Sequence, residues 1–161
     1  MPRKIALCGL LTACAMIFSY IEFLFPLSIA IPGIKLGLAN IVIVIALYKF
    51  GFRYALVINM LRIFLVALLF SGLYGMLFAL CGGLLSLLVM WLLKKLRFFS
   101  AVGVSVAGGV AHNIGQLLIA SLLVANFAVF YYLPALLLAG VITGAIIGVL
   151  ADNILKRLPN I

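Results

Sequence analysis

The chain has 161 residues, of which 69% are hydrophobic and 8% are charged, and its formal net charge is +9 at pH 7. Its mean hydropathy of +1.49 lies far above the range of water-soluble domains, so most of the chain is expected to lie in a lipid bilayer. The excess of Lys and Arg is therefore interpreted as a membrane-orientation signal, and nucleic acid is not expected as a partner.

The apolar residues fall into six segments separated by proline, glycine or basic residues, which predicts six membrane-spanning helices. The first segment contains Leu11-Thr12-Ala13-Cys14, a sequence similar to a lipoprotein cleavage site. Because apolar residues continue beyond Cys14, an uncleaved first helix is the preferred interpretation. Turns are predicted at 49–53, 71–75 and 94–97. The predicted spans are residues 5–25, 36–48, 54–70, 76–93, 101–124 and 133–155, in one all-α integral membrane domain over residues 1–161.

The distribution of Lys and Arg selects one orientation of this bundle. If the N-terminus is cytoplasmic, nine of the eleven Lys and Arg residues lie on the cytoplasmic side, as the positive-inside rule requires. Both termini are therefore expected in the cytoplasm, and the chain is expected to be a multi-pass protein of the plasma membrane. The nine residues are Arg3, Lys4, Lys49, Arg53, Lys94, Lys95, Arg97, Lys156 and Arg157.

The two remaining basic residues, Arg62 and Lys35, lie away from that side. Arg62 falls in the middle of the third span, three residues after Asn59, so both side chains share a helix face. A charged side chain at that depth costs at least about 2.5–3.5 kcal/mol unless it is paired. Glu22, near the outer end of the first span, lies at a depth from which it can reach Lys35 or Arg62.

Polar residues concentrate in the outer and middle parts of the spans, which predicts a polar cavity that opens to the outside. The alternative is a set of interhelical hydrogen bonds that fix the packing. A single histidine makes no metal site, so His112 is interpreted as a ligand contact or a proton carrier. The predicted ligand-binding residues are Glu22, Lys35, Asn40, Asn59, Arg62, His112, Asn113 and Gln116.

Small residues recur every fourth position on two of the spans, a spacing that predicts close helix–helix packing in lipid. The first span carries small residues as well, which leaves room for an external partner. The predicted packing residues are Gly103, Ala107, Ala111, Gly115, Gly140, Gly144 and Gly148.

Motifs for independent catalysis are missing from the sequence. The chain has no Walker A loop, no Asp-rich motif for a magnesium–diphosphate group and no Ser-His-Asp set. The chain is therefore not expected to be an enzyme or to bind and hydrolyse ATP by itself. Three cysteines lie in apolar runs without C-x-x-C spacing, so neither a disulfide nor a metal site is predicted from Cys8, Cys14 and Cys81.

Four segments of the sequence, PGIKLGLANIVIVIAL at 32–47, LRIFLVALLFSG at 61–72, GGLLSLLVMWLLKK at 82–95 and GGVAHNIGQLL at 108–118, resemble the Gx transporter family, which also carries the label heptaprenyl diphosphate synthase component I. That family is similar to the S components of energy-coupling factor (ECF) transporters, which are small six-helix proteins for micronutrient uptake. The resemblance implies docking through the first helix on a T subunit driven by two ATPases, and an outer connection that places Lys35 near the substrate. The implied docking residues are Ala6, Gly9, Ala13 and Ala15.

The preferred functional interpretation is a substrate-capture subunit of an ECF-type importer for a micronutrient or an isoprenoid- or quinone-related metabolite. Two cations against one acid favour a small ligand with an anionic group and an apolar body. The alternative is a non-catalytic membrane partner of a prenyl diphosphate synthase, which would use the basic turns. A stand-alone membrane enzyme that uses His112 is a third interpretation.

Overall fold

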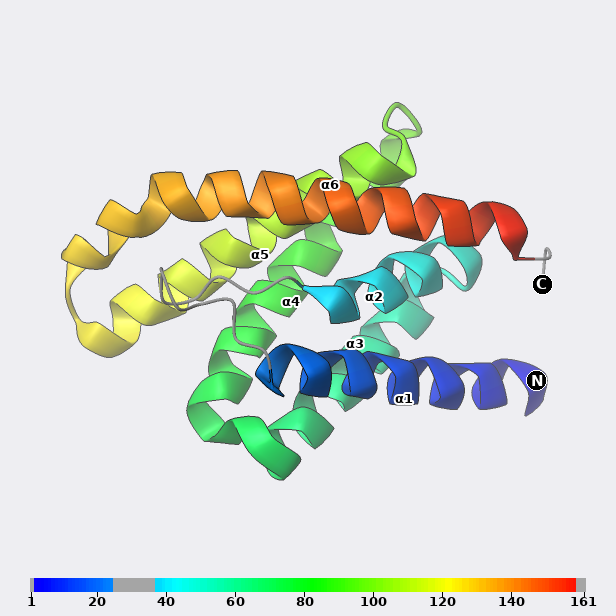
Figure 1. The fold of residues 1–161 in the computed structure, drawn as a ribbon, viewed down its shortest axis with the longest axis horizontal. Coiled ribbons are helices and arrows are strands. Elements are labelled where there is room, and N and C mark those ends of the chain that lie inside the picture. The colour runs from blue at the N-terminus through cyan, green and yellow to red at the C-terminus, as the bar shows by residue number, and fades with distance from the viewer. Residues whose placement is uncertain (1, 25–36, 159–161) are drawn as a thin grey trace.

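The computed structural model describes residues 2–24 and 37–158, and the regular structure of these residues is entirely helical. Figure 1 shows the helices packed in one bundle, with α2 between α1 and α6. The helices are α1 (Pro2–Leu24), α2 (Leu38–Lys49), α3 (Phe52–Val66), α4 (Gly72–Leu96), α5 (Ala101–Val124) and α6 (Leu133–Arg157), with a π-helix η2 (Ala67–Ser71) and a 3₁₀-helix η3 (Phe127–Tyr132).

Several of these helices are long and apolar enough to cross a membrane. Lys4–Leu24, Phe52–Leu96, Ala101–Val124 and Phe127–Arg157 meet that description, and α2 is a shorter apolar helix. At about 1.5 Å per residue, the 12 residues of α2 fall short of a hydrocarbon core of about 30 Å. The prediction of an all-α membrane-embedded chain is confirmed in these terms. Six separate spans and two cytoplasmic termini stay predictions.

The turn predicted at 71–75 lies at the junction of α3 and α4, although the helical assignment runs without a gap from α3 through η2 into α4. The chain nevertheless reverses direction there (Figure 1). Gly72 has a φ of +67°, a conformation that favours glycine. The N–H of Gly72 donates to the carbonyl oxygen of Ala67, so the last turn of η2 is closed by a backbone hydrogen bond directly at the reversal.

Helix α2 forms the centre of the bundle. Every residue from Ile41 to Leu47 is buried, so the helix has no solvent-facing or lipid-facing stripe. A helix that is apolar on all sides is typical of a core position. Because α2 packs against α1, α3 and α6, its position determines what lies at the centre of the bundle.

Helices α5 and α6 pack through glycine with their backbones nearly in contact. An added Cβ at Gly144 would lie 2.7 Å from Cα of Val106, and one at Gly148 would lie 2.8 Å from Cα of Val102. Gly140 faces Gly109 and Val110 in the same way, with distances of 3.0 Å. Such close approach is possible because the α6 positions in these contacts carry no side chain.

The residues of the predicted ridge on α5 face different neighbours. Gly115 packs on the backbone of Cys81 in α4, whereas an added Cβ at Gly103 would touch only Phe99 and Ser100, at 3.6–3.8 Å, beside the start of its own helix. Four-residue steps rotate by about 40° each around a helix, so a ridge of three steps cannot face one partner. The closest approach to α6 instead involves Gly109, which was not predicted.

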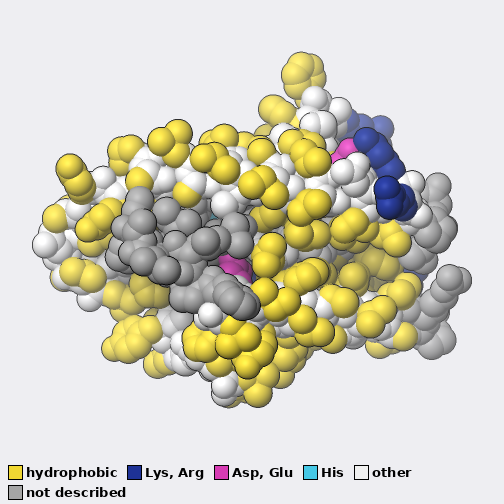
Figure 2. All heavy atoms as spheres, in the orientation of Figure 1, with side chains coloured by type: hydrophobic (Ala, Val, Ile, Leu, Met, Phe, Trp, Pro, Cys, Tyr) yellow, Lys and Arg dark blue, Asp and Glu magenta, His cyan; other side chains and the backbone are white. Residues whose placement is uncertain are grey.

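The basic residues gather at one end of the bundle, where both termini also lie (Figures 1 and 2). Lys94 Nζ donates to the carbonyl oxygens of Leu47, at 2.6 Å, and Tyr48, at 3.5 Å. Lys49 Nζ donates to the carbonyl oxygen of Leu158 at 2.9 Å. These bonds hold the C-terminal end of α2 between α4 and α6.

Replacing Lys94 with Ala is expected to lower the free energy of unfolding by about 1.5–3 kcal/mol, because charge-assisted hydrogen bonds to the end of α2 are lost. Lys95 provides the control: it is exposed and lies 5.6 Å from the ring centre of Trp91, so Lys95→Ala is expected to cost less than about 1 kcal/mol. Thermal unfolding of both variants in one detergent measures the difference. Equal destabilisation would contradict the role of Lys94.

Candidate functional site

A charged cluster lies between α1 and α3, and we define it as Ser19, Glu22, Asn59 and Arg62. Arg62 is 9% exposed and Asn59 is 1% exposed. The Nη2 atom of Arg62 donates to Asn59 Oδ1 at 2.8 Å, and Nη1 donates to Ser19 Oγ at 3.4 Å. Glu22 interacts electrostatically with Arg62 and accepts a hydrogen bond from the backbone N–H of Gly37. Arg62 is therefore held in the bundle interior by groups from both helices.

Two buried donors of this cluster have no hydrogen-bond partner among the described residues, namely Arg62 Nε and Asn59 Nδ2. A buried donor without an acceptor costs about 1–3 kcal/mol. Both groups are donors, so the group that satisfies them must offer acceptor atoms. A carboxylate, a phosphate or a carbonyl oxygen has the required chemistry.

The glycine pair Gly82 and Gly83 of α4 brings polar residues of α3 and α5 towards each other. An added Cβ at Gly83 would lie 3.0 Å from Asn59 Nδ2, and one at Gly82 would lie 2.9 Å from the carbonyl oxygen of His112. Neighbouring positions on α4 thus approach α3 on one side and α5 on the other. A larger residue at Gly83 would push α3, which carries Asn59, away from α4. A larger residue at Gly82 would push α5, which carries His112, away from α4.

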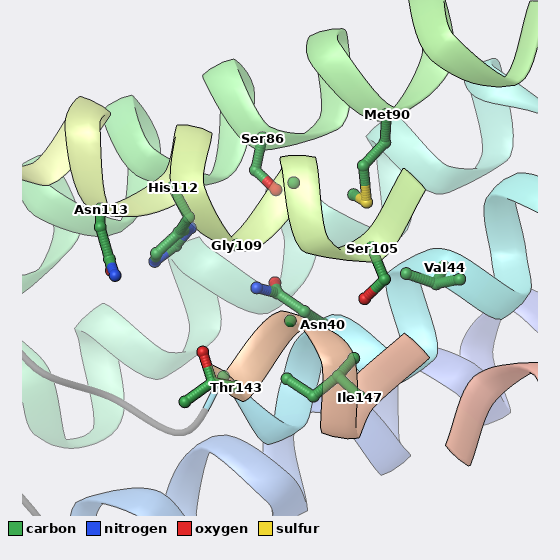
Figure 3. A pocket seen from close by; sticks show the side chains of 13 residues that line it. Asn40, Val44, Ser86, Met90, Ser105, Gly109, His112, Asn113, Thr143 and Ile147 are labelled. Carbon is green, nitrogen blue, oxygen red and sulfur yellow. The ribbon is translucent and has the colours of Figure 1, made fainter. Parts of the chain in front are cut away.

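A second polar site, which we call the neutral cavity, lies between α2, α4, α5 and α6. Its volume is about 20 Å³. Figure 3 shows the polar side chains around it, including Asn40 from α2 and Ser86 from α4. The cavity is lined by Gly37, Asn40, Val44, Ser86, Met90, Ser105, Gly108, Gly109, His112, Asn113, Thr143, Gly144 and Ile147.

Hydrogen bonds to backbone carbonyls orient two of the polar side chains of the neutral cavity. Asn113 Nδ2 donates to the carbonyl oxygen of Leu136 at 2.7 Å, and Thr143 Oγ1 donates to that of Ala139 at 2.8 Å. Ser86 Oγ is buried and has no hydrogen-bond partner among the described residues. The cavity therefore combines oriented amide and hydroxyl groups with one unsatisfied hydroxyl.

The predicted ligand-binding residues divide between the two sites. Glu22, Asn59 and Arg62 belong to the charged cluster, and Lys35 lies outside the described residues. Gln116 is 8% exposed and approaches Gly82 beside His112, and it is not among the residues that line the cavity. The neutral cavity contains the remaining three, Asn40, His112 and Asn113.

Gly37 connects the two sites. Its N–H donates to Glu22, and the same residue lines the neutral cavity. Gly37 has a φ of +70°, which favours glycine at the residue before α2. The start of α2 therefore touches both polar sites.

The hydroxyl residues of both sites were missed from the sequence. Weak signals exist: Ser86 follows the glycine pair by one turn, Ser105 lies seven residues before His112, and Thr143 precedes Gly144 in the glycine repeat of α6. Serine and threonine are frequent in membrane helices, so such signals have low specificity. The missed residues are Ser19, Ser86, Ser105 and Thr143.

The implied docking face on α1 is only partly exposed. Ala6, Gly9 and Ala13 are exposed, and an added Cβ at Gly9 would meet no atom within 4 Å. Ala15 is 0% exposed and belongs to the hydrophobic core, which corrects its assignment to this face. Positions two residues apart point to nearly opposite sides of a helix, so Ala13 and Ala15 cannot share one surface.

The size of the neutral cavity limits what it contains in this conformation. A cavity of about 20 Å³ accommodates about one water molecule, whereas sites for organic ligands measure about 300–1,000 Å³. Within the described part of the chain, no group of three His, Cys, Asp or Glu residues is arranged to hold a metal ion. A larger ligand requires the helices around the cavity to separate.

A family model described as heptaprenyl diphosphate synthase component I matches residues 11–154. The match begins within α1, ends within α6 and contains every residue of both polar sites. Comparisons with curated proteins and with solved structures gave no match. The resemblance predicted from the sequence is thus confirmed for this family label, while the similarity to ECF S components stays a prediction.

Proposed function

The chain belongs to the heptaprenyl diphosphate synthase component I family, and we propose that it is a membrane-embedded subunit that captures a small molecule from outside the cell. The observation that carries this proposal is the contact of the charged cluster and the neutral cavity at Gly37, inside an otherwise apolar bundle. Polar and charged groups at membrane depth are costly and typically mark substrate sites and pathways.

The direction of capture is inferred from the ends of α1 and α2 at which the polar sites and the basic residues lie. Glu22 lies near the C-terminal end of α1 and Gly37 directly before α2, whereas Lys4 and Lys49 lie at the opposite ends of these helices. If the basic end faces the cytoplasm, as the positive-inside rule favours, both sites are closer to the outer surface. The unsatisfied donors of Arg62 and Asn59 favour a ligand with an anionic or carbonyl group.

Transport would need an energy source from another protein. An ECF-type T subunit with two ATPases is the partner we propose, and ATP would act only through these subunits. The exposed small residues Ala6, Gly9 and Ala13 leave one side of α1 open to close helix packing.

A second candidate function is that of a non-catalytic membrane partner of a prenyl diphosphate synthase. The family description names a synthase component, and the exposed residues Lys95, Arg97, Lys156 and Arg157 offer a basic surface at one end of the bundle. On this proposal the partner docks on the basic end, and the internal polar groups serve helix packing.

Purification of the tagged protein from its native membrane in mild detergent separates the two proposals. We expect a T subunit and two ATPases to co-purify. A Gly9→Leu variant should lose them, because the new side chain blocks the exposed side of α1, while a paired Lys95→Gln and Arg97→Gln variant should retain them. A soluble prenyltransferase that is lost from the second variant and not from the first would overturn the importer proposal.

A further inference from the structure

We infer that the neutral cavity binds an uncharged hydrogen-bonding group of the captured molecule, such as an amide or a hydroxyl, and that Ser86 is the central contact. This inference rests on the proposed capture function and deepens it, because it specifies the chemistry of the buried part of the ligand. The anionic group would remain at the charged cluster, on the other side of Gly37.

Ser86 is the observation from which the inference starts. Its side chain is 2% exposed, and its Oγ atom has no hydrogen-bond partner among the described residues. A helical serine can satisfy its own hydroxyl by donating to the carbonyl four residues earlier, as Thr143 does with Ala139. The Ser86 hydroxyl is instead available to the cavity that it lines (Figure 3).

The lining of the cavity favours a group without charge. None of the described residues around it is an acid, a lysine or an arginine. An ion placed there would lose its hydration without gaining a counter-ion, which is unfavourable at membrane depth. Hydroxyl and amide groups can replace the water that surrounds a neutral polar group.

The hydrogen bonds already present define what the ligand group must offer. Asn113 and Thr143 use donors on backbone carbonyls, so their side-chain oxygens remain as acceptors. The Ser86 hydroxyl can both donate and accept. A group that has a donor and an acceptor together, as an amide, an imide or a hydroxyl has, complements this arrangement.

The walls of the cavity also indicate how the site opens. Gly109 and Gly144 hold α5 and α6 together, and Gly82 and Gly115 hold α4 against α5, through backbone contacts. Helix α2 lines the cavity with Asn40 and Val44 and has no such glycine contact with α4. Movement of the N-terminal end of α2, which lies away from the Lys94 and Lys49 hydrogen bonds at its other end, is therefore the opening that we infer.

Thiol labelling tests the inference without partner subunits. Ser86→Cys is introduced after replacement of the native Cys8, Cys14 and Cys81 by Ala, and the full-length protein is treated with hydroxyethyl or sulfonatoethyl methanethiosulfonate. These two reagents differ chiefly in charge. The neutral reagent is expected to label the cysteine more than about tenfold faster, since an uncompensated charge is excluded at this depth. Intact-mass spectrometry follows the labelling rate.

Two further variants keep the outcome decisive. Ser105→Cys places a thiol on another wall of the cavity and serves if Ser86→Cys does not fold. Thr12→Cys, on α1, is buried outside the cavity and is expected to stay unlabelled. Failure of the neutral reagent to label either cavity position, equal labelling by the sulfonate, or equal labelling of Thr12→Cys would overturn the inference. Loss of the capture proposal would instead appear as absent ATPases, with the labelling pattern unchanged.

Discussion

Replacement of Gly109 with Ala is expected to remove most of the folded protein. The added Cβ would lie 2.5 Å from the carbonyl oxygen of Gly140 and 3.3 Å from Cα of Gly144. Both atoms belong to the backbone, so no side-chain rotation relieves the overlap, and α5 and α6 must move apart. We expect a loss of about 3 kcal/mol or more in the free energy of unfolding, at the upper end of overpacking effects.

Gly9 and Gly103 provide matched controls for this prediction, because all three residues are helical glycines. An added Cβ meets nothing within 4 Å at Gly9 and makes only ordinary contacts of 3.6–3.8 Å at Gly103. Gly→Ala at these positions should be neutral or stabilising by up to about 1 kcal/mol, through helix propensity. The readouts are the melting temperature in detergent and the monodisperse yield. If the melting temperature of Gly109→Ala equals that of the Gly9→Ala control, the contact between α5 and α6 is looser than described.

The helical segments could be predicted from the sequence because their signals are local. Long apolar runs and basic or glycine-containing interruptions placed the fifth span at 101–124, which agrees with the bounds of α5. The reversal after α3 falls within the turn predicted at 71–75, whereas the π-helix η2 that precedes it was not predicted. A glycine indicates that the chain can turn, but the sequence gives no signal for the hydrogen-bonding pattern of the residues before it.

The composition of the candidate site could be predicted only in part, because it depends on which helix faces meet. The sequence assigned Arg62 and His112 to one predicted cavity, yet the structure places Arg62 beside α1 and His112 on the neutral cavity. Hydropathy indicates how deep a residue lies in the membrane, but it does not indicate which neighbouring helix the side chain faces. The Ser86 hydroxyl could be recognised only from its burial and from the lack of a partner among the residues that the structure describes.

The two polar sites differ in the chemical groups that they can bind. The charged cluster contains a cation, an acid and two donors without a partner among the described residues, whereas the neutral cavity contains hydroxyl, amide and imidazole groups. A molecule with an anionic end and an uncharged polar end would satisfy both through the start of α2. Its specificity would then come from the spacing of these two groups, since apolar contacts discriminate weakly between related molecules.

Replacement of Arg62 with Gln is expected to abolish capture and to destabilise the protein by about 1.5–3 kcal/mol, because the charge-assisted hydrogen bonds of the buried guanidinium to Asn59 and Ser19 are lost. The same replacement in a Glu22→Gln background should cost less, since the acid that Arg62 balances is already neutral. We expect a coupling energy of about 1–3 kcal/mol between the two positions. Denaturant unfolding of the four proteins of this cycle, in one detergent, measures it.

Two further variants serve as controls. Arg62→Lys tests whether the shape of the guanidinium matters in addition to its charge, and Arg53→Gln tests whether loss of any arginine from α3 has the same effect. Arg62→Lys keeps the charge but lacks the planar fork that reaches Asn59 and Ser19 together, so it should recover stability more fully than capture. Arg53→Gln changes an exposed arginine of the same helix and should alter neither property. Strictly additive effects of the Arg62 and Glu22 replacements would contradict an electrostatic interaction between these two side chains. Arg62 would then be balanced by something other than Glu22, and the most direct candidate would be the anionic group of the captured molecule itself.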